Sequence, residues 1–236
     1  MYNPKDITVV ILAGGKGRRL APYTTNFPKP LMPVGDKPIL EVLLRRLQRQ
    51  GFNNIVIATG HLEELIRAYF GDGRKFGISI AYSHEDSPRG TAGPLDPMRE
   101  RLTGDFLLIN GDTLCDISFG DMIAFHYNKK ATATVALSRR TVDIDFGVVE
   151  CNAQQEIVNW KEKPKIDYLV STGIYFFSNS ALATLPRNEF INLPDFLIRL
   201  QSAGQRVSGY EHTGYWLDIG RPDDYEKACE DITRLE

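Results

Sequence analysis

A glycine-rich and basic segment directly follows the first apolar run of this 236-residue chain. The run at residues 7–13 reads ITVVILA, and the next seven residues read GGKGRRL. Glycines between a strand and a helix let backbone N–H groups approach phosphate oxygens. Between Gly14 and Arg49 the chain holds eight Lys and Arg residues against only Asp36 and Glu41. A small polyanion therefore fits this region, and a plain strand-to-loop turn is the alternative interpretation.

Two common phosphate-binding motifs do not match this segment. It lacks the Gly-Lys-Ser/Thr ending of a P-loop, and Leu20 stands where a dinucleotide fingerprint has Gly or Ala. The missing third glycine makes a nicotinamide-dependent oxidoreductase the weaker interpretation. Lys29 instead lies between Pro28 and Pro30, which fix their own φ and favour an extended Lys29. Such restraint suits a cation aimed at a fixed anion, although an exposed lysine in a proline-rich turn has the same pattern.

Two aspartates at the ends of apolar runs are further candidates for a binding site. Asp112 follows the run FLLIN at residues 106–110, and Asp218 ends the run YWLD at residues 215–218. Open α/β sheets bind their ligands at the carboxyl ends of strands. An aspartate at the end of a strand is as often a cap or turn former as a ligand, so neither position is decisive by itself.

The apolar patterns predict an α/β fold with a mixed, mainly parallel central sheet. The first half alternates strand-like and helical runs in the order βαβαβ, which predicts parallel pairing. These runs lie at residues 7–13, 38–51, 54–59, 62–70 and 78–83. In the second half, strand-like runs follow one another without helices and predict an antiparallel portion, at residues 146–151, 156–163 and 168–178. Helical patterns are expected at residues 119–130, 192–204 and 222–235.

Composition and charge limit the class of protein. The length of the chain and its composition, 42% hydrophobic and 25% charged residues, predict a single globular domain over residues 1–236. A net charge of −2 disfavours nucleic acid as a partner, and no apolar run is long enough to cross a membrane. The N-terminus lacks the pattern of an export signal, so a cytoplasmic location is expected. Free thiols are expected at Cys115, Cys151 and Cys229. Structural or solvent-exposed roles are expected for His61, His84, His126 and His212.

Several motifs together resemble the sugar-1-phosphate nucleotidyltransferases, also called nucleoside-diphosphate-sugar pyrophosphorylases. The segment LAGGKGRRLAPYTTNFPKPLMPV resembles the G-G-x-G-x-R-L and P-K-P-L signature of that family. SHEDSPRGTAGPL, LLINGDTLCD, DFGVVE, WKEKP, STGIYFFS and GYWLDIG resemble its later motifs, in the same order. The resemblance implies a three-layer αβα sandwich of the Rossmann-like nucleotide-diphospho-sugar transferase fold. It also implies Mg²⁺-dependent attack of a sugar-1-phosphate oxygen on the α-phosphorus of a nucleoside triphosphate, with release of pyrophosphate.

The same resemblance implies roles for individual residues. The catalytic residues would be Arg19, Lys29 and Asp112, and the Mg²⁺ ligands would be Asp112 and Asp218. The nucleotide would be held by Leu12, Ala13, Gly14, Gly15, Gly17, Gly90 and Thr91. The sugar phosphate would be held by Gly147, Glu162, Lys163 and Ser171. Arg18 stands where the family more often has Thr or Ser, and Ser171 stands where relatives often have Asn, which leaves the sugar preference open at that position.

The amino-acid sequences of two motifs indicate which substrates to expect. SHEDSPRGTAGPL and GDTLCDISFGDMIAFH look closest to mannose-1-phosphate guanylyltransferases, so GTP and mannose-1-phosphate are the expected substrates. A uridylyl- or thymidylyltransferase acting on a glucose, heptose or N-acetylmuramic acid phosphate is an alternative, as is a non-catalytic regulatory homologue. Guanylyltransferases of this kind commonly carry a C-terminal β-helical domain, which is not expected in a chain of this length. A homo-oligomer is left open.

Overall fold

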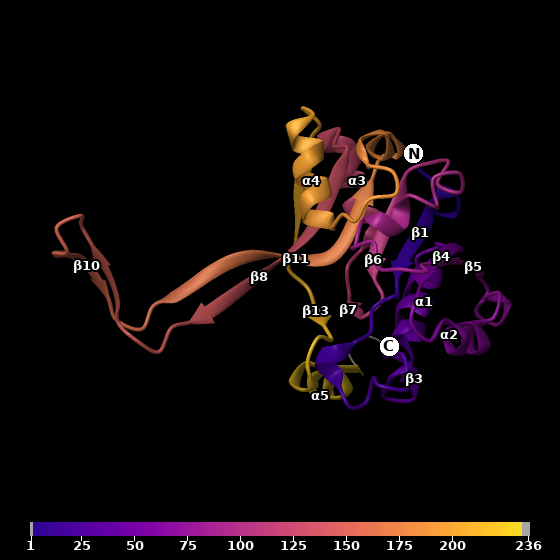
Figure 1. The fold of residues 1–236 in the computed structure, drawn as a ribbon, viewed down its shortest axis with the longest axis horizontal. Helices are drawn as coiled ribbons and strands as arrows, with labels where there is room; N and C mark the ends of the chain where they lie inside the picture. The colour runs from indigo at the N-terminus through magenta and orange to yellow at the C-terminus, as the bar shows by residue number, and fades with distance from the viewer. Residues whose placement is uncertain (1, 233–236) are drawn as a thin grey trace.

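A seven-stranded sheet forms the centre of the computed structural model, which describes residues 2–232 (Figure 1). Its strands are β1 (Thr8–Leu12), β4 (Asn54–Thr59), β5 (Ser79–His84), β6 (Phe106–Asn110), β8 (Ala133–Asp143), β11 (Lys165–Phe177) and β12 (Val207–His212). They lie in the order β12-β8-β11-β6-β1-β4-β5. Strand β11 is antiparallel to both of its neighbours, and every other pair in the sheet is parallel. The predicted mixed, mainly parallel sheet is confirmed.

Helices cover both faces of this sheet and complete the three layers. They are α1 (Ile39–Arg49), α2 (Glu63–Phe70), α3 (Phe119–Lys129), α4 (Leu193–Ser202) and α5 (Pro222–Asp231). Along β1, Val9 and Ile11 belong to the apolar cluster shared with α1, α2 and α3, whereas Val10 belongs to the cluster shared with α4. The alternation buries β1 on both faces, as its β-branched sequence predicts. Among residues 2–232, none of the helices has both the length and the apolar character that a membrane crossing needs.

Two of the expected helices show how local signals set the ends of these elements. Helix α1 begins directly after Pro38 and ends just before Gly51, whose φ of 88° lies in the left-handed region that favours glycine. The helical pattern expected at residues 222–235 is α5, which ends at Asp231. Residues 233–235 of that pattern lie outside the described part of the chain.

Six short strands pair outside the main sheet. They are β2 (Pro33–Val34) with β3 (Lys37–Pro38), β7 (Thr113–Cys115) with β13 (Trp216–Asp218), and β9 (Val148–Cys151) with β10 (Ile157–Lys161). The pair β7–β13 is antiparallel and places Asp218 opposite Thr113. It therefore brings a C-terminal segment of the chain to the end of β6, where Asp112 lies.

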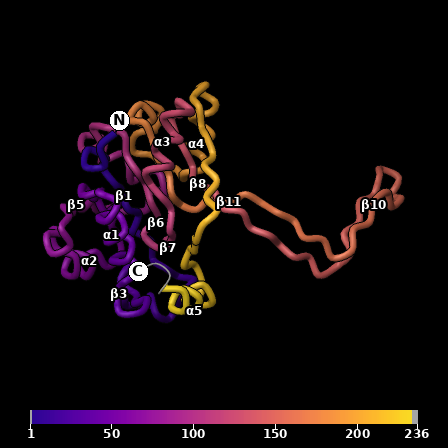
Figure 2. The backbone as a smooth tube through the Cα atoms, turned by 180° about the vertical axis from the view of Figure 1, so that it is seen from behind, coloured from indigo at the N-terminus to yellow at the C-terminus, as the bar shows by residue number. Residues whose placement is uncertain are grey.

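Strands β8 and β11 leave the sheet together and form a long projection, residues 139–170, which we call the arm (Figure 1 and Figure 2). Within the sheet, β8 pairs with β12 as far as Ser138, and β11 pairs with β6 from Ile174 onward. Beyond these points β8 and β11 pair with each other, and the hairpin β9–β10 forms the tip. The antiparallel pairing agrees with the sequence prediction, but nothing in the sequence pattern predicted a projection away from the sheet.

Candidate active site

A cavity of about 880 Å³ opens where the parallel strands end. Leu12, Ala58, His84 and Asn110, at or near the carboxyl ends of β1, β4, β5 and β6, line it. This is the edge at which open α/β sheets bind their ligands. Ten of the residues named from the sequence line the same cavity: Leu12, Ala13, Gly14, Gly15, Gly17, Arg19, Lys29, Gly90, Thr91 and Asp112.

Two glycines of this cavity have backbone positions that other residues would not tolerate. Gly17 has a φ of 59°, and the Thr24 hydroxyl donates a hydrogen bond of 2.7 Å to its carbonyl oxygen. Gly90 has a φ of 82°, and a Cβ there would lie 2.3 Å from the carbonyl oxygen of Ile191. Both conformations are ones that glycine adopts readily. The two loops that bound the cavity are therefore held in shape by glycine at fixed positions.

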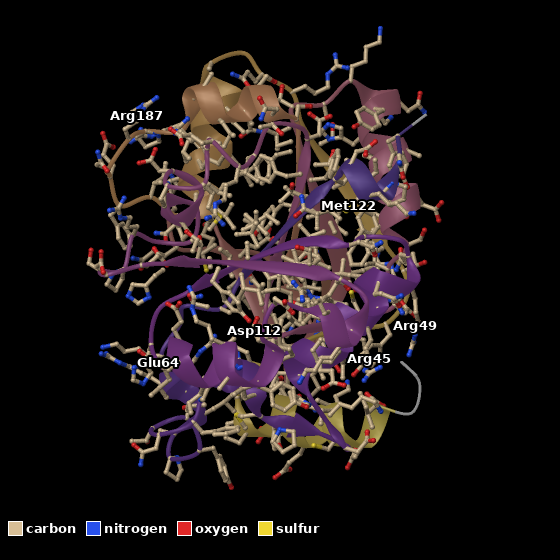
Figure 3. All side chains as sticks on the ribbon, turned by 90° about the vertical axis from the view of Figure 1, so that its right-hand side faces the viewer. Arg45, Arg49, Glu64, Asp112, Met122 and Arg187 are labelled. Carbon is tan, nitrogen blue, oxygen red and sulfur yellow. The ribbon has the colours of Figure 1, made fainter. Side chains whose placement is uncertain are left out.

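Lys29 is buried at the cavity and pairs with the carboxylate of Asp112. It begins a short 3₁₀ helix, Lys29–Leu31, so the extended conformation expected for Lys29 is wrong, and Pro28 before it is extended instead. The residue is 8% exposed, and its Nζ donates to Asp112 Oδ2. The alternative of an exposed lysine in a proline-rich turn is therefore wrong. Figure 3 shows Asp112 inside the body of the molecule, whereas Arg187 lies at its edge.

Asp218 lies beside this ion pair. The amide of Ile219 donates to the Asp112 carbonyl oxygen at 3.1 Å, which ties the end of β13 to the Asp112 backbone. Burial and the neighbouring Asp112 carboxylate raise the pKa of Asp218, while the Lys29 and Arg19 cations oppose the rise. The topology therefore brings together the two aspartates that the sequence left as separate candidates.

The two carboxylates fit Mg²⁺ by their chemistry, because Mg²⁺ prefers hard oxygen ligands and usually keeps several waters. The electrostatic coupling of Asp218 to Asp112 indicates that a cation between them would relieve their repulsion. Among residues 2–232, His, Cys, Asp and Glu side chains form no group of three or more that could hold a metal by themselves. Phosphate oxygens and water would have to supply the other ligands.

Arg18 and Arg19 both line the cavity from the turn that follows the glycines. The Arg19 guanidinium lies against Gly220, where an added Cβ would be 3.1 Å from Arg19 Nη1. This contact places Arg19 beside the C-terminal segment that carries Asp218. The sequence left open whether Arg18 points only to solvent, and the structure places it at the cavity although it is exposed.

Glu85, a partly buried carboxylate in the cavity wall, is a candidate site residue that was not predicted from the sequence. It follows β5 directly, and its Oε1 accepts a hydrogen bond of 3.3 Å from the Arg89 amide. Burial raises the pKa of Glu85, while the Arg89 amide opposes the rise. The motif SHEDSPRGTAGPL contains Glu85, but only its later Gly90 and Thr91 were expected to bind the nucleotide. An acidic residue at the carboxyl end of a parallel strand was the signal that could have identified it.

The histidines and cysteines agree with the sequence expectations in part. His126 is buried and hydrogen-bonds the hydroxyl oxygens of Thr134 and Ser178, which is a structural role. His61 and His84, however, line the cavity. All three cysteines are free thiols: Cys115, Cys151 and Cys229.

The four residues expected to hold the sugar phosphate do not line this cavity. Gly147, Glu162 and Lys163 lie on the arm, and Ser171 lies at its root, where the Ser171 hydroxyl is 3.0 Å from the Tyr175 hydroxyl. Gly147 and Glu162 are nevertheless close to one another, since a Cβ at Gly147 would lie 3.0 Å from Glu162 Oε2. The structure thus separates a nucleotide-type cavity in the body from a second group of candidate residues on the arm.

Comparisons of this chain with known proteins identify one family of similar sequences and structures. The sequence pattern of a family described as Nucleotidyl transferase matches residues 8–234. A mannose-1-phosphate guanylyltransferase of Mycobacterium tuberculosis is 30% identical over 235 residues, 97% of this chain, and this chain spans 65% of its length. A D-glycero-alpha-D-manno-heptose 1-phosphate guanylyltransferase of Aneurinibacillus thermoaerophilus is 31% identical over 94% of this chain and 97% of its own. A structure from Bacillus anthracis, described as a glucose-1-phosphate thymidylyltransferase, superposes with a TM-score of 0.76 at 26% identity, covering 95% of this chain and 94% of its own.

Proposed function

Because this chain belongs to the nucleotidyl transferase family, we propose that it joins a nucleoside triphosphate and a sugar-1-phosphate into a nucleotide-sugar and releases pyrophosphate. The observation that carries this proposal is the buried Lys29, paired with Asp112 at a glycine-lined cavity. A cation held there suits a ligand with several negative charges. The similar guanylyltransferases of Mycobacterium tuberculosis and Aneurinibacillus thermoaerophilus support the same reaction class.

The chemistry is a displacement at the α-phosphorus. An oxygen of the sugar phosphate forms the new bond to the α-phosphorus, the bond from that phosphorus to the bridging oxygen breaks, and pyrophosphate leaves with the electron pair. Such a transfer depends on alignment and on offsetting negative charge. Amides of Gly14, Gly15 and Gly17 and the Arg19 guanidinium would hold the triphosphate. Lys29 would stabilise the negative charge that develops around the α-phosphate.

Asp112 and Asp218 would hold Mg²⁺ at this site. When bound, the ion would offset charge on the phosphate oxygens and help to align them. Lys29 already neutralises one carboxylate of the pair. On binding, we expect Lys29 to exchange its contact with Asp112 for a phosphate oxygen, so that the carboxylate becomes available to the metal. This chain's part in the reaction is to keep both carboxylates and one cation at the same edge of the sheet.

The position of Glu85 supports GTP as the nucleotide. Guanine presents two neighbouring donors, N1–H and the 2-amino group, and a carboxylate can accept from both. Uracil and thymine present only N3–H on the corresponding edge. Glu85 lines the cavity at the end of β5, beside the Gly90 and Thr91 loop that the family resemblance assigns to the nucleotide. Two relatives are named as guanylyltransferases, whereas the Bacillus anthracis structure is described as a thymidylyltransferase, so the choice of base depends on Glu85.

Mannose-1-phosphate is our first choice of sugar phosphate, on the similarity to the Mycobacterium tuberculosis enzyme. The heptose phosphate named for the Aneurinibacillus thermoaerophilus relative is the second. The cavity itself supports no choice between them, because the residues that the family resemblance assigns to the sugar phosphate lie on the arm.

The decisive experiment measures pyrophosphate release over a matrix of nucleoside triphosphates and sugar-1-phosphates, with and without Mg²⁺. We expect GTP with mannose-1-phosphate among the best pairs, and loss of turnover when EDTA removes the metal. Turnover with UTP or dTTP and none with GTP would overturn the choice of base and leave the reaction class standing. Nucleotide binding without pyrophosphate release from any pair would favour the non-catalytic homologue.

A further inference from the structure

The arm carries a concentration of exposed apolar side chains that the body does not match. Among residues 2–232, eight of the fifteen large, well exposed apolar side chains belong to the arm. They are Val142, Phe146, Val149, Ile157, Val158, Trp160, Tyr168 and Leu169. Phe146 is 78% exposed and Trp160 is 60% exposed. A contiguous apolar surface on a soluble protein marks a contact with another molecule or segment.

Three of these side chains, Val149, Ile157 and Trp160, share one face at the tip of the arm, because the register of β10 shifts by one residue between Ile157 and Asn159. In the hairpin β9–β10, Trp160 lies opposite Val149 and Ile157 lies opposite Cys151. Directly opposed residues share a face, and so do residues two apart on one strand. This gives one apolar face, which we call the tip face, formed by Val149, Cys151, Ile157 and Trp160. On the other face Asn159 donates to the Glu150 carboxylate at 3.2 Å, so that face is polar.

An isolated ribbon of two strands has little stability in water. The tip face has the one-sided pattern of a strand pair that packs against a core, but no other element of the described chain covers it (Figure 1 and Figure 2). The same ribbon carries Gly147, Glu162 and Lys163, which the proposed function needs beside the nucleotide. A protein surface that covers the tip face could therefore also bring these residues to a nucleotide cavity.

The geometry at the root of the arm indicates whether this cavity belongs to the same chain or to a second molecule. The arm leaves the sheet at the cavity edge, where Gly173 packs against Asn110 at the end of β6. From Ser171 opposite Leu137 to Lys165 opposite Asp143, β11 and β8 pair residue by residue. Figure 1 shows this part of the ladder extending away from the central sheet and its helices. The pairing of β11 with β8 shifts register at this root, between Ser171 and Tyr175. Closure on the arm's own cavity would require a further bend there, whereas a second molecule could receive the arm as it stands.

We propose that the arm docks on a second copy of this chain, with the tip face buried against that copy and Glu162 and Lys163 at its nucleotide cavity. The exchange is reciprocal, since a two-fold dimer presents the same arm and the same cavity on each side. The site assignment of Glu162 and Lys163 rests on the proposed function; the docking of the tip face does not.

The apolar area of the arms is sufficient for such a dimer. Stable interfaces bury about 1,200–2,000 Å² in total. An aromatic side chain buries about 150–250 Å² when it becomes fully covered. Each arm offers three aromatic side chains, Phe146, Tyr168 and Trp160, that are 78%, 51% and 60% exposed, so each still has between half and about four fifths of this area to bury, and a dimer offers six of them. Together with the five exposed aliphatic side chains of each arm and the surface that they cover, the two arms reach the required range.

The first experiment measures mass in solution by size-exclusion chromatography with light scattering. We expect a dimer for the wild type and a monomer for the double variant Val149→Glu/Ile157→Glu, because two charges would enter the tip face, where both residues lie. Ile198→Glu on α4 is the matched control, since Ile157 and Ile198 are equally exposed at 58%. This control should remain dimeric. A monomeric wild type at tens of micromolar, or a double variant that stays dimeric, would overturn the proposal.

The second experiment separates exchange between copies from closure within one copy. Lys29→Ala removes a body residue and Lys163→Ala removes an arm residue, so each variant alone should have little activity. Co-expressed and mixed at random, half of the dimers contain one chain of each kind. In each such dimer one of the two cavities has an intact body and an intact partner arm. We therefore expect about a quarter of wild-type activity in the mixture.

An arm that closes on its own cavity would leave the mixture at the average of the two variants, and that result would overturn the exchange. The two proposals fail differently. A wild type without pyrophosphate release from any substrate pair contradicts the proposed function, while light scattering still decides the docking. For that case, a Trp216→Phe variant leaves Trp160 as the single tryptophan. Its emission should shift to shorter wavelength as dilute monomer assembles, and an unchanged emission would contradict burial of the tip face.

Discussion

Lys29 and Asp112 are 83 positions apart in the sequence, and their side chains form an ion pair at the carboxyl edge of the sheet. Lys29 comes from the proline-rich turn and Asp112 from the end of β6. Both side chains are largely buried, with side-chain exposures of 10% and 24%. A charged pair in such a position is a candidate for function, because its groups are positioned before any ligand binds.

Replacement of Lys29 by alanine should lower the rate of the chemical step more than the affinity for the nucleotide. The cation matters most where negative charge develops, and loss of one such group typically lowers the rate by about 10²- to 10³-fold. Single-turnover kinetics and nucleotide titration measure the two quantities separately. Lys37→Ala is a suitable control, since Lys37 pairs with its neighbour Asp36 in the same basic segment. An unchanged single-turnover rate in Lys29→Ala would remove this residue from the reaction.

Asp112→Asn and Asp218→Asn should each nearly abolish Mg²⁺-dependent turnover, and the double variant should be little worse than either. Residues that act as a unit are strongly non-additive. The measurement is pyrophosphate release as a function of Mg²⁺ concentration in correctly folded protein. Near-normal, Mg²⁺-dependent activity in both single variants would show that the two aspartates are only turn residues at the ends of strands.

The same two variants should differ in stability without metal. The raised pKa of Asp218 means that its charged form costs stability at every pH above that pKa, so Asp218→Asn should hold or raise the melting temperature at pH 7. Asp112→Asn instead leaves the buried Lys29 cation without its carboxylate and should lower the unfolding free energy by roughly 1–3 kcal/mol. Thermal unfolding in EDTA compares them. Equal shifts of the melting temperature in the two variants, with the same sign, would contradict the expected difference between Asp112 and Asp218.

Glu85→Gln should weaken the preference for GTP. A glutamine keeps one acceptor and introduces an amide donor, which would face a donor of guanine. Loss of a fitted hydrogen bond in a binding site costs about 1–3 kcal/mol, or roughly 5- to 150-fold in kcat/KM for GTP. The KM for the sugar phosphate should change little. Asp86→Asn, at the adjacent exposed carboxylate, is the control. Identical ratios of GTP to UTP turnover in Glu85→Gln and wild type would contradict a base contact.

Gly90→Ala should destabilise the loop that borders the cavity. Its added Cβ would meet the Ile191 carbonyl oxygen at 2.3 Å, and the φ of 82° is unfavourable for alanine. Strain of this kind costs about 1–3 kcal/mol before the steric clash is counted. Chemical denaturation measures the loss. Gly104→Ala is the matched control, because no heavy atom lies within 4 Å of its added Cβ, and its stability should equal or exceed that of the wild type.

His126 should make the protein sensitive to acid between pH 6.5 and about 4. Burial lowers the pKa of His126 from 6.5 to about 4. Over this window the unfolded chain binds the proton and the folded chain does not, so stability falls as the pH falls. The loss at pH 4 amounts to about 3 kcal/mol for this group. Denaturant titrations across the window should show a smaller slope in His126→Gln than in the wild type, and equal slopes would contradict the assignment.

The sequence predicted the parts of this molecule that depend on local pattern. The apolar run of β1 and the helical spacing of α1 with the glycine after it are local signals. The proline pattern around Lys29 indicated a restrained cation correctly but an extended conformation wrongly, because Lys29 begins a 3₁₀ helix. The meeting of Asp112 and Asp218 could be expected only through family resemblance, because it depends on β13 pairing with β7 from a position about a hundred residues away. Glu85 was missed although it directly follows β5, because its position at the carboxyl end of a parallel strand was not used as a signal.

The course of the arm could not be predicted, because strand pairing fixes register but not direction in space. The alternation in β9 and β10 predicts two faces, yet it does not say what the apolar face will contact. Gly147, Glu162 and Lys163 were therefore expected at the sugar phosphate on the resemblance alone, whereas the structure keeps them on the arm and away from the cavity.

The pairing of β13 with β7 also has a consequence for the order in which the site is assembled during synthesis. The glycine loop, Lys29 and Asp112 all precede α3, so a nascent chain holds these groups long before Asp218 has been translated. Domains generally fold as units as the chain emerges from the ribosome. A polypeptide interrupted before Trp216 would retain the cavity loops and the central strands but lack the second carboxylate. The proposed metal site would then form only after Asp218 had been translated, so products truncated before Trp216 should lack Mg²⁺-dependent turnover even where they fold.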